Sequence, residues 1–153
     1  MKIACGFDHA GFPLKTLVLE TLQGLGHEPV DLGTNSTDPV DYPDVARAVC
    51  QEVMSGEAER GVIVCGSGAG VAVAACKFPG IRAVVAHDHY TAHQAVEHDD
   101  CNVVCMGGRV IGPVYAAEIL ATFAGAQFTG EERHVRRLAK IAAIEREYAT
   151  GGE

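Results

Sequence analysis

The stretch that decides the fold spans residues 61–77 and reads GVIVCGSGAGVAVAACK. Its first five residues are apolar and rich in β-branched side chains, which is typical of a buried strand. Residues 71–77 follow with the pattern of a short helix, and three alternating glycines separate the two segments. A strand, a tight turn and a helix in immediate succession predict one βα unit of a parallel sheet.

The same alternation runs through the rest of the 153 residues. Short apolar runs predict five strands, at 2–6, 29–32, 61–65, 83–86 and 103–106. Helical patterns separate or follow them at 14–25, 43–54, 71–77, 90–97 and 114–124, and a longer helix is expected at 131–148. We therefore expect an α/β fold in which helices cover both faces of a five-stranded parallel sheet. One domain is expected over residues 1–149, with a flexible tail at 150–153.

Composition narrows the possible partners. Hydrophobic residues make up 48% of the chain and charged residues 21%, which is typical of a globular protein. The formal net charge of -8 argues against nucleic acid or an anionic membrane as a partner. No apolar run approaches the ~20 residues of a membrane span, and the N-terminus lacks the features of a signal peptide. We therefore expect a cytoplasmic protein, with most of its six cysteines buried as free thiols.

Ligands of open parallel sheets bind at the carboxyl ends of the strands, which directs attention to Cys65-Gly66-Ser67-Gly68-Ala69-Gly70. Its glycines allow the backbone to approach a ligand, and its amides precede a helix N-terminus, which favours an anion. A tight turn that merely needs small residues is the alternative. Spacing excludes a Gly-x-Gly-x-x-Gly motif, because Val71 and Val73 occupy the third-glycine positions, and no Walker motif is present.

Cys65 ends the strand beside that helix N-terminus. This setting favours the thiolate form of a cysteine, which can serve as a nucleophile or as a general base. An inert thiol is the alternative. A cysteine phosphatase loop would place an arginine six residues after the cysteine, where this chain has Val71.

The last helix carries a cationic face. Four of the twelve Lys and Arg residues fall within an arc of ~100°, assuming ~100° per helical residue. They are Arg133, Arg136, Arg137 and Lys140. Guanidinium groups suit phosphate, so an acidic protein with one such stripe suggests a small anionic substrate, although a solvated charged face is the common alternative. Three apolar residues are expected to point away from this face toward a core: Val135, Leu138 and Ala142.

Several histidines lie near predicted strand ends. His9 follows the first strand beside Asp8, and His98 precedes the fifth, and either could move a proton near neutral pH. A group formed by His87, His89 and His93 raises the alternative of a metal site. The three match no well-known ligand motif, so capping or surface positions explain them more simply.

Five motifs together resemble one family, in order and at matching spacing over nearly the whole chain. They are Gly6-Phe7-Asp8-His9-Ala10-Gly11, Asp41-Tyr42-Pro43, residues 65–70, Gly80-Ile81-Arg82-Ala83 and Gly108-Arg109-Val110-Ile111-Gly112. The family is the type B ribose-5-phosphate isomerases, grouped with galactose-6-phosphate isomerase subunits. The resemblance implies a Rossmann-like three-layer α/β/α sandwich. It also implies a homodimer or tetramer with active sites at the subunit interface, and no metal or organic cofactor.

The resemblance also implies roles for individual residues. Cys65 would be the catalytic base, since Val71 stands where some relatives carry a glutamate base. His98 would donate a proton during ring opening, and Ser67 would act with the glycine loop. The implied substrate-binding residues are Asp8, His9, Gly66, Gly68, Ala69, Gly70, Asp99, Arg109, Arg133 and Arg137.

The implied reaction is aldose–ketose isomerisation of D-ribose 5-phosphate and D-ribulose 5-phosphate through a cis-enediolate. A hexose 6-phosphate of the allose or galactose type is the alternative within the family. Asp99, which replaces the asparagine of some members, bears on this choice of sugar. Outside the family, a cysteine-dependent phosphatase-like enzyme and a nucleotide-binding module remain as alternatives.

Overall fold

Five parallel strands form the centre of the structure, a computed structural model that describes residues 1–149. They are β1 (Lys2–Phe7), β2 (Glu28–Asp31), β3 (Arg60–Cys65), β4 (Ala83–Val85) and β5 (Val103–Gly107). The sheet has the order β2-β1-β3-β5-β4, and every pairing is parallel. The five predicted strands are thereby confirmed, each end lying within one residue of its expected position.

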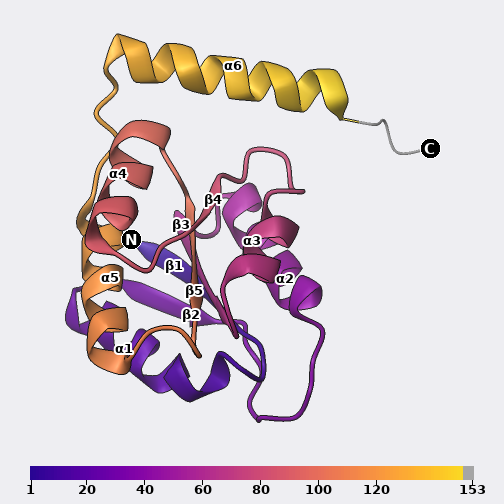
Figure 1. Cartoon of the computed structure of the whole chain (residues 1–153), viewed down its shortest axis with the longest axis vertical. Coiled ribbons are helices and arrows are strands. Elements are labelled where there is room, and N and C mark those ends of the chain that lie inside the picture. Colours follow the sequence, from indigo (N-terminus) through magenta and orange to yellow (C-terminus); the bar gives the residue numbers. More distant parts are fainter. Residues whose placement is uncertain (150–153) are drawn as a thin grey trace.

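Helices connect the strands and cover both faces of the sheet. They are η1 (Phe12–Leu14), α1 (Lys15–Gly24), α2 (Tyr42–Ser55), α3 (Ala69–Ala75), α4 (His89–Asp99), α5 (Pro113–Gly125) and α6 (Glu132–Tyr148). Figure 1 shows α1, α4 and α5 on one side of the sheet and α2 and α3 on the other. The expected three-layer α/β/α sandwich is confirmed. The helix predicted from residue 71 begins at Ala69 instead, because Gly68 adopts a left-handed conformation and starts the helix early.

The core is split by the sheet into two clusters, as expected for strands whose side chains alternate between faces. Ile3 and Phe7 of β1 pack toward α1 and α5, where they meet Leu22 and Phe123. Ala4, between them on the strand, faces the other way and joins the cluster that α2 and α3 cover. Burial on both faces makes the sheet a rigid platform for the loops at its edges.

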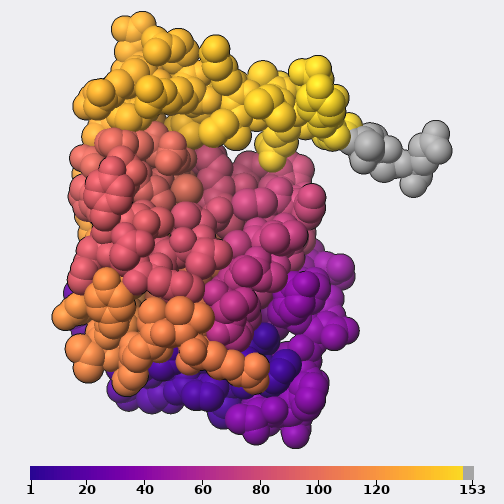
Figure 2. Space-filling view, in the orientation of Figure 1, coloured from indigo at the N-terminus to yellow at the C-terminus, as the bar shows by residue number. Residues whose placement is uncertain are grey.

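The last helix departs from the sequence expectation. Along α6 the buried residue is His134, whereas Val135 is 49% exposed and Leu138 and Ala142 are half-buried. The prediction that Val135 faces a core is therefore wrong for the single chain. The reason is placement: α6 lies across one end of the molecule and meets mainly the last turn of α4 (Figures 1 and 2).

Three further expectations concern membrane-spanning helices, the cysteines and the C-terminal tail. Among the described residues, no helix is both long and apolar enough to span a lipid bilayer. Five of the six cysteines are buried and all six are free, while Cys76 is exposed. The tail predicted at residues 150–153 lies outside the described residues.

Candidate active site

Three loops meet where β1, β3 and β5 end. The amide of Asp8, just after β1, donates to the carbonyl of Val64 on β3 at 3.2 Å. Beyond β5, the amide of Gly108 donates to the carbonyl of Cys65 at 2.7 Å, and that of Arg109 to Gly66 at 3.1 Å. Because these bonds continue the sheet past its last ladder residues, the loops are held as firmly as the strands that precede them.

Cys65 occupies the centre of this edge. Its sulfur accepts the amide hydrogen of Gly68 at 3.1 Å, and the residue is 5% exposed. Gly68 has φ of 82° and is the N-cap of α3. An amide hydrogen aimed at the sulfur stabilises negative charge there, as a base or nucleophile requires. Next along the loop, the exposed Ser67 accepts the amide of Ala69 through its hydroxyl at 3.2 Å.

Four other thiols are made poor bases by their surroundings. Burial raises the pKa of Cys5 to about 12, that of Cys50 to about 11 and that of Cys101 to about 12. Burial also raises the pKa of Cys105 well above its ordinary value. These residues stay protonated at neutral pH, which fits the inert role expected of most of the cysteines.

Asp8 and His9 are held by their own loop and by the loop after β2. One carboxylate oxygen of Asp8 accepts the amides of Ala10 and Gly11, both at 2.8 Å. Nδ1 of His9 accepts the amide of Val40 at 3.2 Å. A neutral imidazole that accepts at Nδ1 carries its hydrogen on Nε2, so His9 can donate from that atom to a ligand.

Arg109 completes this group from the loop after β5. A Cβ atom built on Gly66 would lie 3.8 Å from Nη1 of Arg109, so the guanidinium reaches the glycine loop. His87, which the sequence suggested only as a weak metal candidate, supports the same loop. Its Nε2 accepts the amide of Gly107 at 2.8 Å, a bond that the short edge strand β4 does not supply.

The remaining predicted site residues form a second group at the other end of the sheet. The helix α4 starts beside the carboxyl end of β4 and runs back, so that His98 and Asp99 lie near the beginning of β5. The five residues of β5 give four steps of ~3.3 Å, so the beginning and the carboxyl end of this strand lie ~13 Å apart. Within one chain, Cys65 and His98 therefore cannot act on the same sugar carbon.

The arginines of α6 join this second group. The rings of His98 and His134 stack with centroids 4.2 Å apart, which fixes the first turn of α6 on the last turn of α4. Nε of Arg133 contacts His134 at 3.2 Å and the carboxylate of Glu131 at 3.0 Å. Arg137, one turn further, is exposed on the cationic face that the sequence predicted.

The three histidines considered for a metal have separate partners. His87 accepts from Gly107, while His89 pairs with Glu118 at 3.3 Å and His93 with Glu97 at 3.2 Å. Among the described residues, no group of three or more His, Cys, Asp or Glu side chains could hold a metal ion.

The carboxyl edge of the sheet has the features of an enzyme site for a small polar ligand, with a thiol, an imidazole and a guanidinium around a glycine loop. The family described as Ribose/Galactose Isomerase matches residues 3–141, so the protein class is that of the sugar isomerases. The chain belongs to that family.

Individual relatives agree over almost the full length. The chain is 44% identical over 144 residues to ribose-5-phosphate isomerase B of Escherichia coli, covering 94% of this chain and 96% of that protein. It is 37% identical over 149 residues to D-erythrulose-4-phosphate isomerase 2 of Mycolicibacterium smegmatis, covering 95% and 97%. The structure of Clostridium thermocellum ribose-5-phosphate isomerase B superposes with a TM-score of 0.94 at 43% identity, covering 97% of this chain and 100% of that one.

Proposed function

We propose that this protein interconverts D-ribose 5-phosphate and D-ribulose 5-phosphate, with Cys65 as the catalytic base. The observation that carries the proposal is the sulfur of Cys65, which accepts the Gly68 amide at the carboxyl edge of the sheet. The near-full-length similarity to ribose-5-phosphate isomerase B supports the choice of sugar. All six cysteines are free thiols, which fits work in the reducing cytoplasm.

The reaction begins with an aldose phosphate in its ring form. His98 donates a proton to the ring oxygen as the ring opens, while the carboxylate of Asp8 accepts the proton of the C1 hydroxyl, which becomes the aldehyde. Solvent water then carries that proton from Asp8 back to His98. His9, whose Nε2 can donate, and the carboxylate of Asp8 bind hydroxyl groups of the sugar. The open chain then presents C2 to the sulfur of Cys65.

Proton transfer follows. The thiolate of Cys65 takes the hydrogen from C2, and the electron pair moves onto the carbonyl oxygen to form a cis-enediolate. Amides of the glycine loop and the hydroxyl of Ser67 stabilise that negative charge, an effect typically worth about 3–4 kcal/mol per donor. Return of the proton to C1, with a hydroxyl proton passing from O2 to O1, completes the ketose and restores the thiolate.

A substrate phosphate is expected between Arg109 of one chain and Arg133 and Arg137 of another. Two copies of the chain can bring these groups together, because the two halves of the site lie at opposite ends of the sheet. Each end also exposes large apolar side chains that the single chain leaves uncovered. At the carboxyl edge they are Val73, Tyr90, Val110 and Val114, and on α6 they are Val135, Ile141, Ile144 and Tyr148.

A homodimer with two-fold symmetry would cover both surfaces at once, since each α6 docks on the carboxyl edge of the partner.

The test of this shared site is subunit complementation. Cys65→Ala and Arg137→Met are each made as homodimers and then mixed by unfolding and refolding together. Half of the random dimers would carry one intact site of two, giving about a quarter of the wild-type rate. Rates are compared well below the wild-type KM, because Arg137→Met is expected to act mainly on KM. A mixture no more active than the average of its two parents would show that the shared site is wrong.

The sugar is tested by comparing kcat/KM for aldose phosphates of four, five and six carbons. We expect the pentose to be the best substrate by at least about tenfold, since one missing or added carbon displaces the phosphate from its site. A higher kcat/KM for a tetrose phosphate would favour the activity named for the M. smegmatis relative. Release of inorganic phosphate without isomerisation would favour a phosphatase instead.

A further inference from the structure

The turn that follows His98 has an unusual backbone. Asp100 ends α4 with φ of 47° and ψ of 41°, which makes it the one residue other than glycine with positive φ among residues 1–149. A left-handed conformation costs an L-residue other than glycine of order 1–2 kcal/mol, although aspartate tolerates it better than most. Such a turn persists only where the surroundings hold it. His98 and Asp99 are its immediate neighbours.

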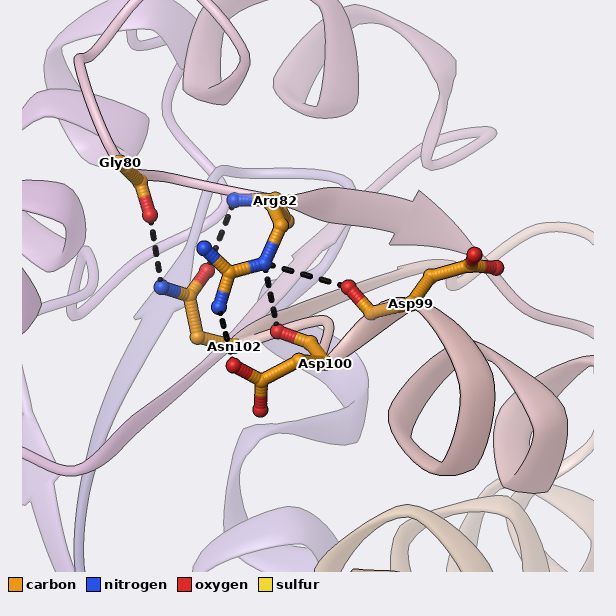
Figure 3. Close-up of polar contacts among 5 residues, drawn as sticks. All are labelled: Gly80, Arg82, Asp99, Asp100 and Asn102. Carbon is orange, nitrogen blue, oxygen red and sulfur yellow. Dashed lines mark hydrogen bonds and ion pairs between the residues drawn. The ribbon is translucent and has the colours of Figure 1, made fainter. Parts of the chain in front are cut away.

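Arg82 holds this turn. Its Nε donates to the carbonyl oxygens of Asp99 at 3.2 Å and Asp100 at 2.8 Å, and its Nη2 contacts the carboxylate of Asp100 at 2.7 Å. The guanidinium thus satisfies two of the carbonyls left without partners at a helix C-terminus, and it places a positive charge there. Figure 3 shows Arg82 directed into the turn from the start of β4.

Arg82 is itself fixed by neighbours on both sides. Its amide donates to the side-chain oxygen of Asn102 at 2.8 Å, and the side-chain nitrogen of Asn102 donates to the carbonyl of Gly80 at 2.9 Å (Figure 3). The amide of Gly80 in turn contacts both carboxylate oxygens of Glu145 on α6, at 3.2 and 3.1 Å. One network therefore joins the turn beside His98 to the helix that carries Arg133 and Arg137.

We propose that Arg82 is a positioning residue that sets the turn after His98 and so orients His98 and Asp99 toward the Cys65 site of a partner copy. The proposal rests on the isomerase function and shared site proposed above. Arg82 acts on the reaction through backbone and not through the substrate. The planar fork of the guanidinium reaches three acceptors at once, which the single ammonium of lysine cannot do in the same geometry.

The kinetic test uses Arg82→Met and Arg82→Lys, with Arg47→Met as the matched control. Arg47 is an exposed arginine of α2 that pairs with Asp44 at 3.8 Å, and it is not among the predicted site residues. We expect Arg82→Met to lower kcat/KM about 10- to 100-fold, because small displacements of catalytic groups have effects of this size. Arg82→Lys should recover part of the loss, and Arg47→Met should match the wild type. A wild-type kcat/KM in Arg82→Met would overturn the proposal.

Complementation separates positioning from a general loss of folding. In a mixed dimer of Arg82→Met and Cys65→Ala, one site combines an intact Cys65 with an intact Arg82 network, so about a quarter of the wild-type rate should return. Failure to recover activity would show that Arg82 serves the Cys65 edge of its own chain, and the proposal would be wrong. If Arg82→Met does not fold, the same mixing is done with Arg82→Lys.

A third measurement does not depend on the substrate. Amide hydrogen exchange of residues 98–102 should quicken in Arg82→Met while exchange in β1 and β3 stays unchanged. Unaltered exchange in the turn would overturn the positioning role even if catalysis were lost. If the wild type turns over no sugar phosphate, the proposed function fails separately, and the exchange result still decides whether Arg82 holds the turn.

Discussion

The two halves of the proposed site are built in different ways. At the carboxyl edge, Cys65 ends a strand buried on both faces, and backbone hydrogen bonds tie the loop after it to the loop after β5. At the opposite end, Arg133 and Arg137 stand exposed on a helix that contacts its own chain mainly through His134 and Glu145. The first half is complete within one chain, whereas the second half is presented outward.

This difference separates the proposed base, Cys65, from the arginines of α6 that are proposed to bind the phosphate. A proton transfer needs its base held to within a fraction of an ångström, which a close-packed sheet edge provides. A phosphate can be gripped by long side chains from a helix, since guanidinium groups reach and adapt. The comparison predicts that substitutions of Cys65 and its glycine loop act on kcat, and that substitutions of the arginines on α6 act on KM.

Removing the base should have the largest effect. Cys65→Ala is expected to lower kcat by about 10³-fold or more, since the variant lacks the thiolate proposed to take the C2 proton. Calorimetric titration with D-ribose 5-phosphate should still show binding, because the phosphate contacts remain. Cys76→Ala is the matched control, an exposed cysteine that should leave the rate unchanged. Residual activity within tenfold of the wild type would rule out Cys65 as the base.

A pair of glycines tests the geometry around that base. Gly68 and Gly26 both have φ of 82°, so an alanine at either should destabilise the fold by about 1–2 kcal/mol. At Gly26 the new methyl meets open space, whereas at Gly68 it would lie 3.1 Å from the carbonyl carbon of Met106 and would shift the amide that Cys65 accepts. We expect Gly68→Ala to lower kcat by about 100-fold, and Gly26→Ala to leave kcat unchanged.

Urea unfolding measures the loss of stability in both glycine variants, and steady-state kinetics measure the loss of kcat expected in Gly68→Ala. Equal losses of activity in the two variants would mean that backbone strain, and not the contact with Cys65, is responsible.

The cationic helix should govern substrate binding. Arg137→Met is expected to raise KM about 10- to 100-fold with a smaller change in kcat, since a hydrogen bond to a charged group is worth about 1.5–3 kcal/mol. Arg136→Met, the adjacent exposed arginine, should change KM by less than about threefold, as an exposed charge contributes little. Similar KM values for the two variants would show that the whole cationic face, and not one position, attracts the substrate.

The sequence predicted the carboxyl edge well because its signals are local. A strand, three glycines and a helix follow one another in residues 61–77, so the place of Cys65 could be inferred without knowing any distant contact. Tertiary contacts were harder. Nothing near His87 in sequence indicates that it accepts the amide of Gly107, and nothing near Arg82 indicates that it holds the turn at Asp100.

The error on α6 has a similar origin. The period of Val135, Leu138 and Ala142 indicates an apolar face, but a sequence does not state whether the same chain, another chain or solvent meets that face. An amphipathic helix predicts a buried stripe whether the burial occurs within one chain or between two. Roles assigned to the individual site residues stay predictions until the variants above are measured.

The attachment of α6 should respond weakly to pH. His134 is 1% exposed and its Nδ1 has no hydrogen-bond partner among the described residues. Desolvation, and then the neighbouring His98 and Arg133, lower the pKa of His134 below its usual 6.5. The unfolded chain therefore binds a proton at this site more readily than the folded chain. The stability that neutral His134 contributes is present above the unfolded pKa and is lost as pH falls toward the folded one.

We therefore expect the free energy of unfolding to fall between pH 7 and pH 5, and His134→Phe, which keeps the stack on His98, to reduce that slope. Urea unfolding at several pH values measures this slope, and the protein concentration is kept fixed because oligomers gain stability with concentration. His27→Phe is the comparison, because desolvation and the N-terminal charge lower the pKa of His27, which lies beside Met1 and just before β2. The reductions in pH slope caused by His134→Phe and His27→Phe should add, as the effects of substitutions at distant sites usually do. An unchanged slope in His134→Phe would mean that the first turn of α6 leaves the body of the protein before it is protonated.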